Sequence, residues 1–127
     1  MSFYEEAREK SKSFPIDDVI LKYSDIIIEM IKDKIILEMR LENNEAIISF
    51  TAKYNKYVEV ESLKDLRNAS IDNVGYFLKY NKKYRNFILI NISKALGEEF
   101  TIQSRENVRR RGYYGEDFTM TYTITWE

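Results

Sequence analysis

Residues 118–127 read F-T-M-T-Y-T-I-T-W-E, so large apolar residues alternate strictly with threonine. In an extended strand, successive side chains point to opposite faces, which would place the apolar residues on one face and the threonines on the other. This period of two predicts a β-strand with one face in a core and the other face in water. We therefore expect this strand to close the fold at its C-terminal end.

The residues that precede this strand predict the rest of a hairpin. A strand over about 100–108 would lead into the segment R-R-R-G-Y-Y-G, residues 109–115, at the hairpin tip. Arginine guanidinium groups suit carboxylates and phosphates, and tyrosine rings can fill a partner's pocket or stack on a base. We therefore predict a partner-binding site in this loop, formed by Arg109, Arg110, Arg111, Tyr113 and Tyr114.

The same loop also has a simpler interpretation as a solvated turn. In that interpretation the three arginines pair with their acidic neighbours Glu106, Glu116 and Asp117. All charged residues after Arg111 are acidic, so one arm of the hairpin would be basic and the other acidic. A loop held in this way would act as a rigid tip rather than as a flexible basic tail.

A longer basic segment includes the first arm of this hairpin. Residues 79–111 contain nine Lys or Arg and three Asp or Glu, a net charge of +6 in a chain whose total is −1. Such a segment can face nucleic acid, or it can pair with the acidic N-terminal helix. Basic residues interleaved with tyrosine also occur on ordinary helices, where lysine stems cover apolar neighbours. The candidate nucleic-acid-binding residues are Lys79, Lys82, Lys83, Arg85 and Arg105.

The N-terminal part of the chain predicts two helices. Residues 2–12 form a short polar segment with weak helical character. Apolar residues recur at helical spacing from Ile16 to Ile31, and Pro15 suits a first helical position because its missing N–H costs nothing there. We therefore predict helices over 2–12 and 15–32.

The next part of the chain predicts strands. Residues 35–41 and 46–52 each alternate apolar and polar side chains, and an Asn-Asn pair between them suits a two-residue hairpin turn. A third strand over 57–61 would follow, with a bulge or an odd-length connection before it to keep its valines on the buried face. We therefore predict a three-strand meander over about 34–62.

Residues 63–97 are compatible with two structures. Most of their apolar residues roughly fit helical spacing, and Gly97 suits the position after a helix end. The run F-I-L-I-N-I, residues 87–92, is also typical of a buried strand. We favour helix over this segment, broken or bent near residues 81–83.

Together these segments predict a single α+β domain over residues 1–127. Its sheet would be mostly antiparallel, with the meander over about 34–62 and the C-terminal hairpin over about 100–126. Its helices would pack on one face of the sheet, and the threonines of the last strand would lie on the other. A chain of this length can bury a core without disulfides.

The composition removes most catalytic chemistry. The chain has no cysteine and no histidine, which excludes thiol nucleophiles, zinc–thiolate sites and the commonest general base. It also lacks a phosphate-binding glycine motif and an acidic loop with the spacing of calcium ligands. We therefore expect a protein that is not an enzyme and that uses no metal or other cofactor.

The hydropathy pattern indicates no contact with membranes. No apolar run approaches the ~20 residues that span a bilayer, and the N-terminus has no apolar signal-peptide region. We therefore expect a cytoplasmic protein. Abundant Ile, Lys, Tyr and Asn indicate AT-rich codon usage, which is compatible with a phage or mobile-element origin.

Two functional hypotheses remain. The first is a non-enzymatic protein-binding module, such as an inhibitor, an accessory factor or an assembly subunit, that acts through the Arg/Tyr loop and an exposed sheet surface. An exposed edge strand would also allow a homo-oligomer to form. The alternative is a nucleic-acid-binding domain that uses residues 79–111. A fall in affinity with rising salt would distinguish that alternative, because phosphate contacts release counterions.

Overall fold

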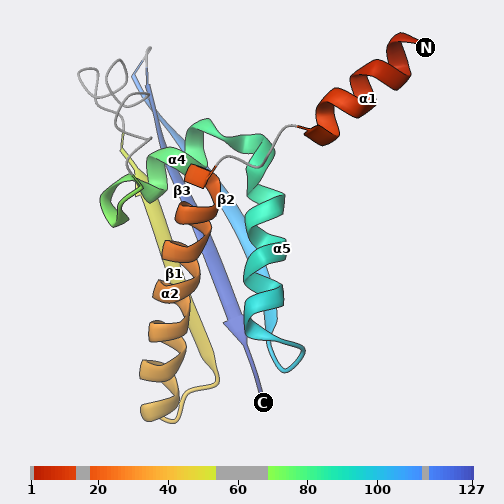
Figure 1. Cartoon of the computed structure of the whole chain (residues 1–127). Coiled ribbons are helices and arrows are strands. Elements are labelled where there is room, and N and C mark those ends of the chain that lie inside the picture. The colour runs from red at the N-terminus through yellow and green to blue at the C-terminus, as the bar shows by residue number, and fades with distance from the viewer. Residues whose placement is uncertain (1, 14–17, 54–68, 113–114) are drawn as a thin grey trace.

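The computed structural model describes residues 2–13, 18–53, 69–112 and 115–127. In these residues, helices pack on one face of a three-stranded antiparallel sheet, so the predicted α+β class is confirmed (Figure 1). The elements, in chain order, are α1 (Phe3–Ser13), α2 (Asp18–Arg40), β1 (Glu45–Ala52), the 3₁₀ helix η1 (Ile71–Asn73), α4 (Val74–Tyr80), the 3₁₀ helix η2 (Lys82–Tyr84), α5 (Arg85–Leu96), β2 (Thr101–Arg111) and β3 (Gly115–Thr125).

The sheet is built around the C-terminal strand. Its order is β1-β3-β2, so β3 lies in the centre and pairs antiparallel with both neighbours. Tyr122 of β3, for example, lies opposite Ile48 of β1 and opposite Ser104 of β2. The hairpin predicted over about 100–126 is therefore confirmed as β2 and β3.

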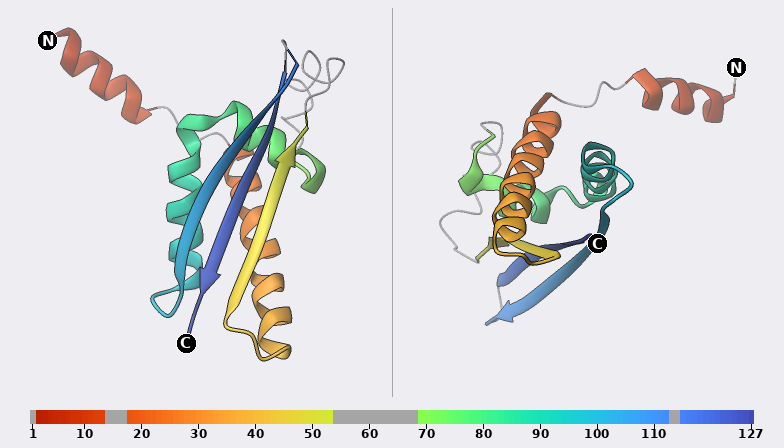
Figure 2. Two further views of the ribbon diagram at one scale, coloured as in Figure 1. Left: turned by 180° about the vertical axis from the view of Figure 1, so that it is seen from behind. Right: turned by 90° about the horizontal axis from the view of Figure 1, so that it is seen from below.

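The alternation along β3 decides which face of the sheet is buried. Its apolar residues from Phe118 to Ile124 are at most 2% exposed, whereas the threonines between them are partly exposed. The helices supply the other half of the core, where the Tyr23 ring of α2 stacks on the Phe77 ring of α4 at a centroid distance of 4.1 Å. Figure 2 shows α2, α4 and α5 on the same side of the sheet. The threonine face, which we call the open face, carries none of these helices.

Residues 35–41 are not a strand, and the predicted hairpin with residues 46–52 is wrong. α2 continues to Arg40 because a stripe of buried isoleucines, spaced by four residues, runs from Ile27 to Ile35. Ile35 belongs to both patterns, but only the stripe continues into the core, because the alternating residues after Ile35 are exposed. Those apolar residues are exposed at the end of the helix, at Leu37, Met39 and Leu41.

β1 pairs with β3 instead of with the segment before it, so the arrangement predicted as a meander is wrong. Phe50 of β1 is the partner of Met120, which places the apolar face of β1 on the same core. Beyond the end of β3, the Trp126 N–H donates to the Asn44 carbonyl at 3.1 Å. The third strand, predicted over 57–61, lies outside the described residues.

The predicted helices are found where the structure describes those segments. α1 corresponds to the helix predicted over 2–12, and Figure 1 shows it apart from the other elements. α2 corresponds to the helix predicted over 15–32, although its predicted first residues lie outside the described ranges. In the ambiguous segment, residues 84–93 lie mostly in α5 and not in a strand. The predicted break near 81–83 falls at η2.

α4 approaches β1 very closely at Gly75. A Cβ atom at this position would overlap the carbonyl oxygen of Thr51 and would lie 2.5 Å from its carbonyl carbon. Both are backbone atoms of a paired strand, so they cannot move aside as the end of a flexible side chain would. Glycine at this position therefore sets the distance between α4 and the sheet.

Candidate partner-binding site

β2 forms one outer edge of the sheet. Among the described strands it pairs only with β3, so its second edge lies at the side of the sheet (Figure 2). Ten of its 11 residues are exposed, and Ile102 is half-buried. This strand is longer than the usual 5–6 residues. An exposed edge of this length presents unpaired backbone N–H and C=O groups to another strand.

The odd-numbered residues of β2 lie on the open face. Val108 is the partner of the buried Phe118, so the residues on either side of Val108 occupy the opposite face. Arg105, Arg109 and Arg111 are therefore brought together with the threonines of β3. In the strand register, the open face consists of Glu45, Ile47, Ser49, Thr51, Gly115, Asp117, Thr119, Thr121, Thr123, Thr125, Thr101, Gln103, Arg105, Asn107, Arg109 and Arg111.

The three arginines predicted in the hairpin loop belong to β2 instead. The ladder continues to the pair Arg111 and Gly115, so the strand extends through all three residues. Alternation separates them, because Arg110 lies on the helix side whereas Arg109 and Arg111 lie on the open face. The two tyrosines predicted with them, Tyr113 and Tyr114, lie outside the described residues.

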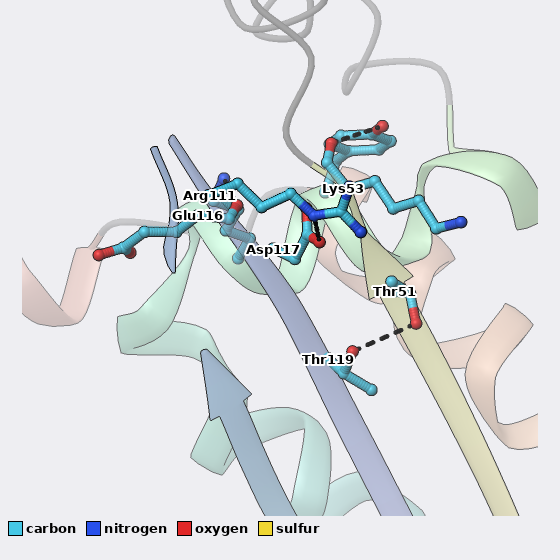
Figure 3. A network of polar contacts seen from close by, with 8 residues as sticks. Thr51, Lys53, Arg111, Glu116, Asp117 and Thr119 are labelled. Atoms are coloured by element: carbon cyan, nitrogen blue, oxygen red, sulfur yellow. Dashed lines mark hydrogen bonds and ion pairs between the residues drawn. The ribbon is translucent and has the colours of Figure 1, made fainter. Parts of the chain in front are cut away.

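One of these arginines is held by an acidic neighbour. Arg111 Nε lies 2.7 Å from Asp117 Oδ2, and Figure 3 shows this ion pair at the end of the hairpin. The Arg111 side chain remains 62% exposed, while that of Asp117 is 14% exposed. The predicted pairing of arginines with hairpin acids is thus found at this one pair among the described residues.

Arg105 has no acidic residue among its cross-strand neighbours on β3. It lies opposite Thr121, and its diagonal neighbours on the open face are also threonines. The hydroxyls of this surface bond to one another. Ser49 Oγ lies 2.9 Å from Thr121 Oγ1. Thr51 Oγ1 lies 3.3 Å from Thr119 Oγ1, a contact shown in Figure 3. The surface beside Arg105 is therefore neutral, and the charge of Arg105 is not compensated across the strand pair.

Arg85, predicted as a nucleic-acid-binding residue, makes its polar contacts within the protein. Its Nε donates to the Leu78 carbonyl at 2.6 Å, and one Nη donates to the Lys79 carbonyl at 3.1 Å. The other Nη lies 2.8 Å from Glu106 Oε1, and the guanidinium lies 4.5 Å from the Phe118 ring centroid. The side chain is 11% exposed. Arg85 therefore joins the end of α4 to β2 and offers little surface to a ligand.

The lysines near Arg85 lie with the helices and not on the open face. Lys79 Nζ donates to the Glu116 carbonyl at 3.0 Å, and Lys83 Nζ lies 4.9 Å from the Tyr84 ring centroid. Lys82 and Lys83 are exposed on η2. The candidate nucleic-acid-binding residues therefore divide between two sides of the sheet, with Arg105 alone on the open face.

Sequence reasoning missed a hollow at the opposite end of the sheet. Its volume is about 860 Å³, and the Phe100 and Trp126 rings meet beside it at a centroid distance of 5.8 Å. No sequence pattern indicated this hollow, because Trp126 is the last apolar residue of an alternating strand. The lining residues are Met39, Glu98, Glu99, Phe100, Thr101, Thr125, Trp126 and Glu127.

Two tyrosine hydroxyls lie in or beside the core. Burial raises the pKa of Tyr122, although the positive charge of Arg85 partly opposes that rise, and the Tyr122 hydroxyl has no hydrogen-bond partner in the described structure. Burial also raises the pKa of Tyr23, and a side-chain hydrogen bond with Asn73 lowers it. Both tyrosines therefore stay protonated at neutral pH and belong to the packing of the core.

Among the described residues, no group of three or more His, Cys, Asp or Glu side chains gathers in a way that could hold a metal ion. None of the described helices is long and apolar enough to cross a membrane. Comparisons with protein-family models, with curated proteins and with solved structures found no match to this chain.

Proposed function

We propose that this protein is a non-enzymatic protein-binding module, such as an inhibitor, an accessory factor or an assembly subunit, that acts through its exposed sheet surface. The observation that carries the proposal is β2, an edge strand of 11 residues with ten exposed side chains. Edge strands of this kind bind protein segments by adding a strand to the sheet.

Charge on an edge strand also has a protective role, because it discourages unwanted strand pairing. On β2, the three charged residues of the open face are all arginines, while Val108 on the helix side is 52% exposed. A purely protective role for the charges does not account for the exposed Val108. The combination of arginines on the open face and an exposed valine on the helix side therefore favours a specific partner.

Nucleic acid is the second candidate, and one observation favours it. Arg105, Arg109 and Arg111 lie together on the open face, where they could contact phosphates. Two observations weigh against it. Arg85 is occupied inside the protein, and the described part of the open face carries no aromatic ring on which a base could stack.

A site-specific cross-linking experiment tests the proposal. A photoreactive amino acid at position 107, between the arginines on the open face, would be compared with the same amino acid at position 94, an exposed position on α5. We expect one protein to be captured in the native cell from position 107 and not from position 94. Capture of nucleic acid from position 107 would favour the second candidate. Equal capture from both positions would remove the support for this surface.

A further inference from the structure

We propose that the partner of β2 is an acidic, extended protein segment that adds to the free edge of β2 as a new strand, an inference that rests on the proposed protein-binding function. The added strand would place carboxylates on the open face beside Arg105 and Arg109, and apolar side chains on the helix side. Its backbone would pair with β2, and its carboxylates would set the register.

The charges on the open face favour an acidic strand. Arg105 and Arg109 are exposed, and Asn107 lies between them on the same face. Threonines surround Arg105 on β3, while Asp117 opposite Arg109 already pairs with Arg111. Charges of opposite sign attract when they lie at directly paired positions on neighbouring strands. Carboxylates at alternate positions of an added strand would therefore meet positive charge that the sheet itself leaves uncompensated.

The other face of β2 favours apolar side chains at the positions between those carboxylates. Val108 is 52% exposed and Ile102 is half-buried, and both lie on the helix side as partners of Phe118 and Ile124. Glu106 lies between them and already pairs with Arg85, so it does not require a basic partner. Between Ile102 and Arg109, an alternating acidic and apolar sequence fits both faces of β2.

A second copy of β2 is a poor occupant of this edge. With all 11 residues aligned antiparallel, Glu106 would lie opposite Glu106. The next registers that keep the two open faces on one side would place Arg105 opposite Arg105, or Arg105 opposite Arg109. Like charges directly opposite each other are destabilising. Each of the three longest self-pairings contains such a pair, so the edge disfavours the homo-oligomer that an exposed strand would otherwise allow.

The test measures the binding of defined peptides by fluorescence anisotropy. The probe is a labelled ten-residue peptide of alternating glutamate and valine. Three comparison probes are the same peptide with lysine for glutamate, the same peptide with three consecutive N-methylated residues at its centre, and a labelled 12-nucleotide oligothymidine. N-methyl groups remove backbone donors from both edges of the peptide and leave its charge unchanged, so they separate strand pairing from simple attraction.

Two matched protein variants complete the test. Arg105→Gln/Arg109→Gln removes two positive charges from the open face, and Lys22→Gln/Lys94→Gln removes two from exposed positions on α2 and α5. Circular dichroism and thermal unfolding would establish that both variants are folded. We use glutamine because a glutamate at position 109 would lie opposite Asp117.

We expect the acidic peptide to bind at least tenfold more tightly than the lysine peptide or the N-methylated peptide. We also expect the Arg105→Gln/Arg109→Gln variant to bind the acidic peptide at least tenfold more weakly than the wild type does. The Lys22→Gln/Lys94→Gln variant should lose less than twofold in affinity for the same peptide. Equal losses in the two variants, or unchanged binding of the N-methylated peptide, would overturn the inference. So would tighter binding of the oligothymidine than of the acidic peptide.

This result can be separated from a failure of the proposed function. If a protein is cross-linked from position 107 but the acidic peptide does not bind, the protein-binding function stands and the acidic-strand inference is wrong. If position 107 captures no protein and the peptide does not bind, both are wrong.

Discussion

The close approach of α4 to β1 makes a sharp prediction about Gly75. In Gly75→Ala, the new Cβ would overlap the Thr51 carbonyl oxygen and lie 2.5 Å from the carbonyl carbon, so α4 has to move away from the sheet. Overpacking typically costs 1–3 kcal/mol, and the rigid backbone neighbours indicate the upper end, about 3 kcal/mol. The better helix propensity of alanine offsets roughly 0.5–1 kcal/mol of this cost. We therefore expect a net loss of about 2 kcal/mol in the free energy of unfolding.

Urea unfolding followed by circular dichroism and by the fluorescence of Trp126, the single tryptophan, would measure this loss. For a domain of this size, about 2 kcal/mol corresponds to a Tm lower by roughly 8 °C. Gly112→Ala is the control. Apart from its two chain neighbours, no described residue has an atom within 4 Å of the new Cβ, so the cost comes from its φ of 66° and is about 1 kcal/mol. A Gly75→Ala protein as stable as the wild type, or no less stable than Gly112→Ala, would refute the steric argument.

Further predictions concern buried polar groups. Arg85→Met removes the donors to the Leu78 and Lys79 carbonyls and leaves Glu106 without its partner. We expect the free energy of unfolding, measured with urea, to fall by about 2–3 kcal/mol. The control is the exposed Lys83→Met, for which we expect a loss of less than about 0.5 kcal/mol. Tyr122→Phe removes a buried hydroxyl without a partner, and we expect unchanged stability or a gain of up to about 1 kcal/mol. Because burial raises the pKa of Tyr122 above its unfolded value near 10, its protonated form contributes stability that is complete below pH 10 and is lost as the pH rises above it. Between pH 9 and about pH 11, the free energy of unfolding should therefore fall less steeply with pH in Tyr122→Phe than in the wild type. Equal slopes in the two proteins would show that Tyr122 does not cause this pH dependence.

The strongest local patterns predicted the fold class and its central element. The apolar and threonine alternation of residues 118–125 correctly gave a half-buried strand and the hairpin before it. The prediction failed at 35–41, where two periods overlap. Ile35 fits both an alternating strand and the stripe of buried isoleucines at a spacing of four, and only the position of the core distinguishes them. No local signal indicated that β1 would pair with β3, because that choice depends on contacts distant in sequence.

In the candidate site too, some features follow from local sequence and others depend on the strand register. Composition drew attention to the basic residues from Lys79 to Arg111, but it grouped Arg105 with Arg85. The strand register separates them, because Arg105 lies on the open face and Arg85 reaches into the junction of α4 and β2. Alternation within β2 would have predicted that Arg110 and Arg109 occupy opposite faces, had the strand been extended to Arg111 in the sequence interpretation.

The central position of β3 has a consequence for how the chain acquires its structure during synthesis. The paired residues of β1 and β3 are separated by 66 positions at Ala52 and Phe118 and by 80 positions at Glu45 and Thr125. At a translation rate of 5–20 residues per second, β1 leaves the ribosome roughly 3–16 s before the strand that it needs. Its apolar face must spend that time against α2, whose contacts with β1 are local, or against a chaperone. The order of the strands in the sheet thus makes formation of the sheet a late event and formation of α2 an early one.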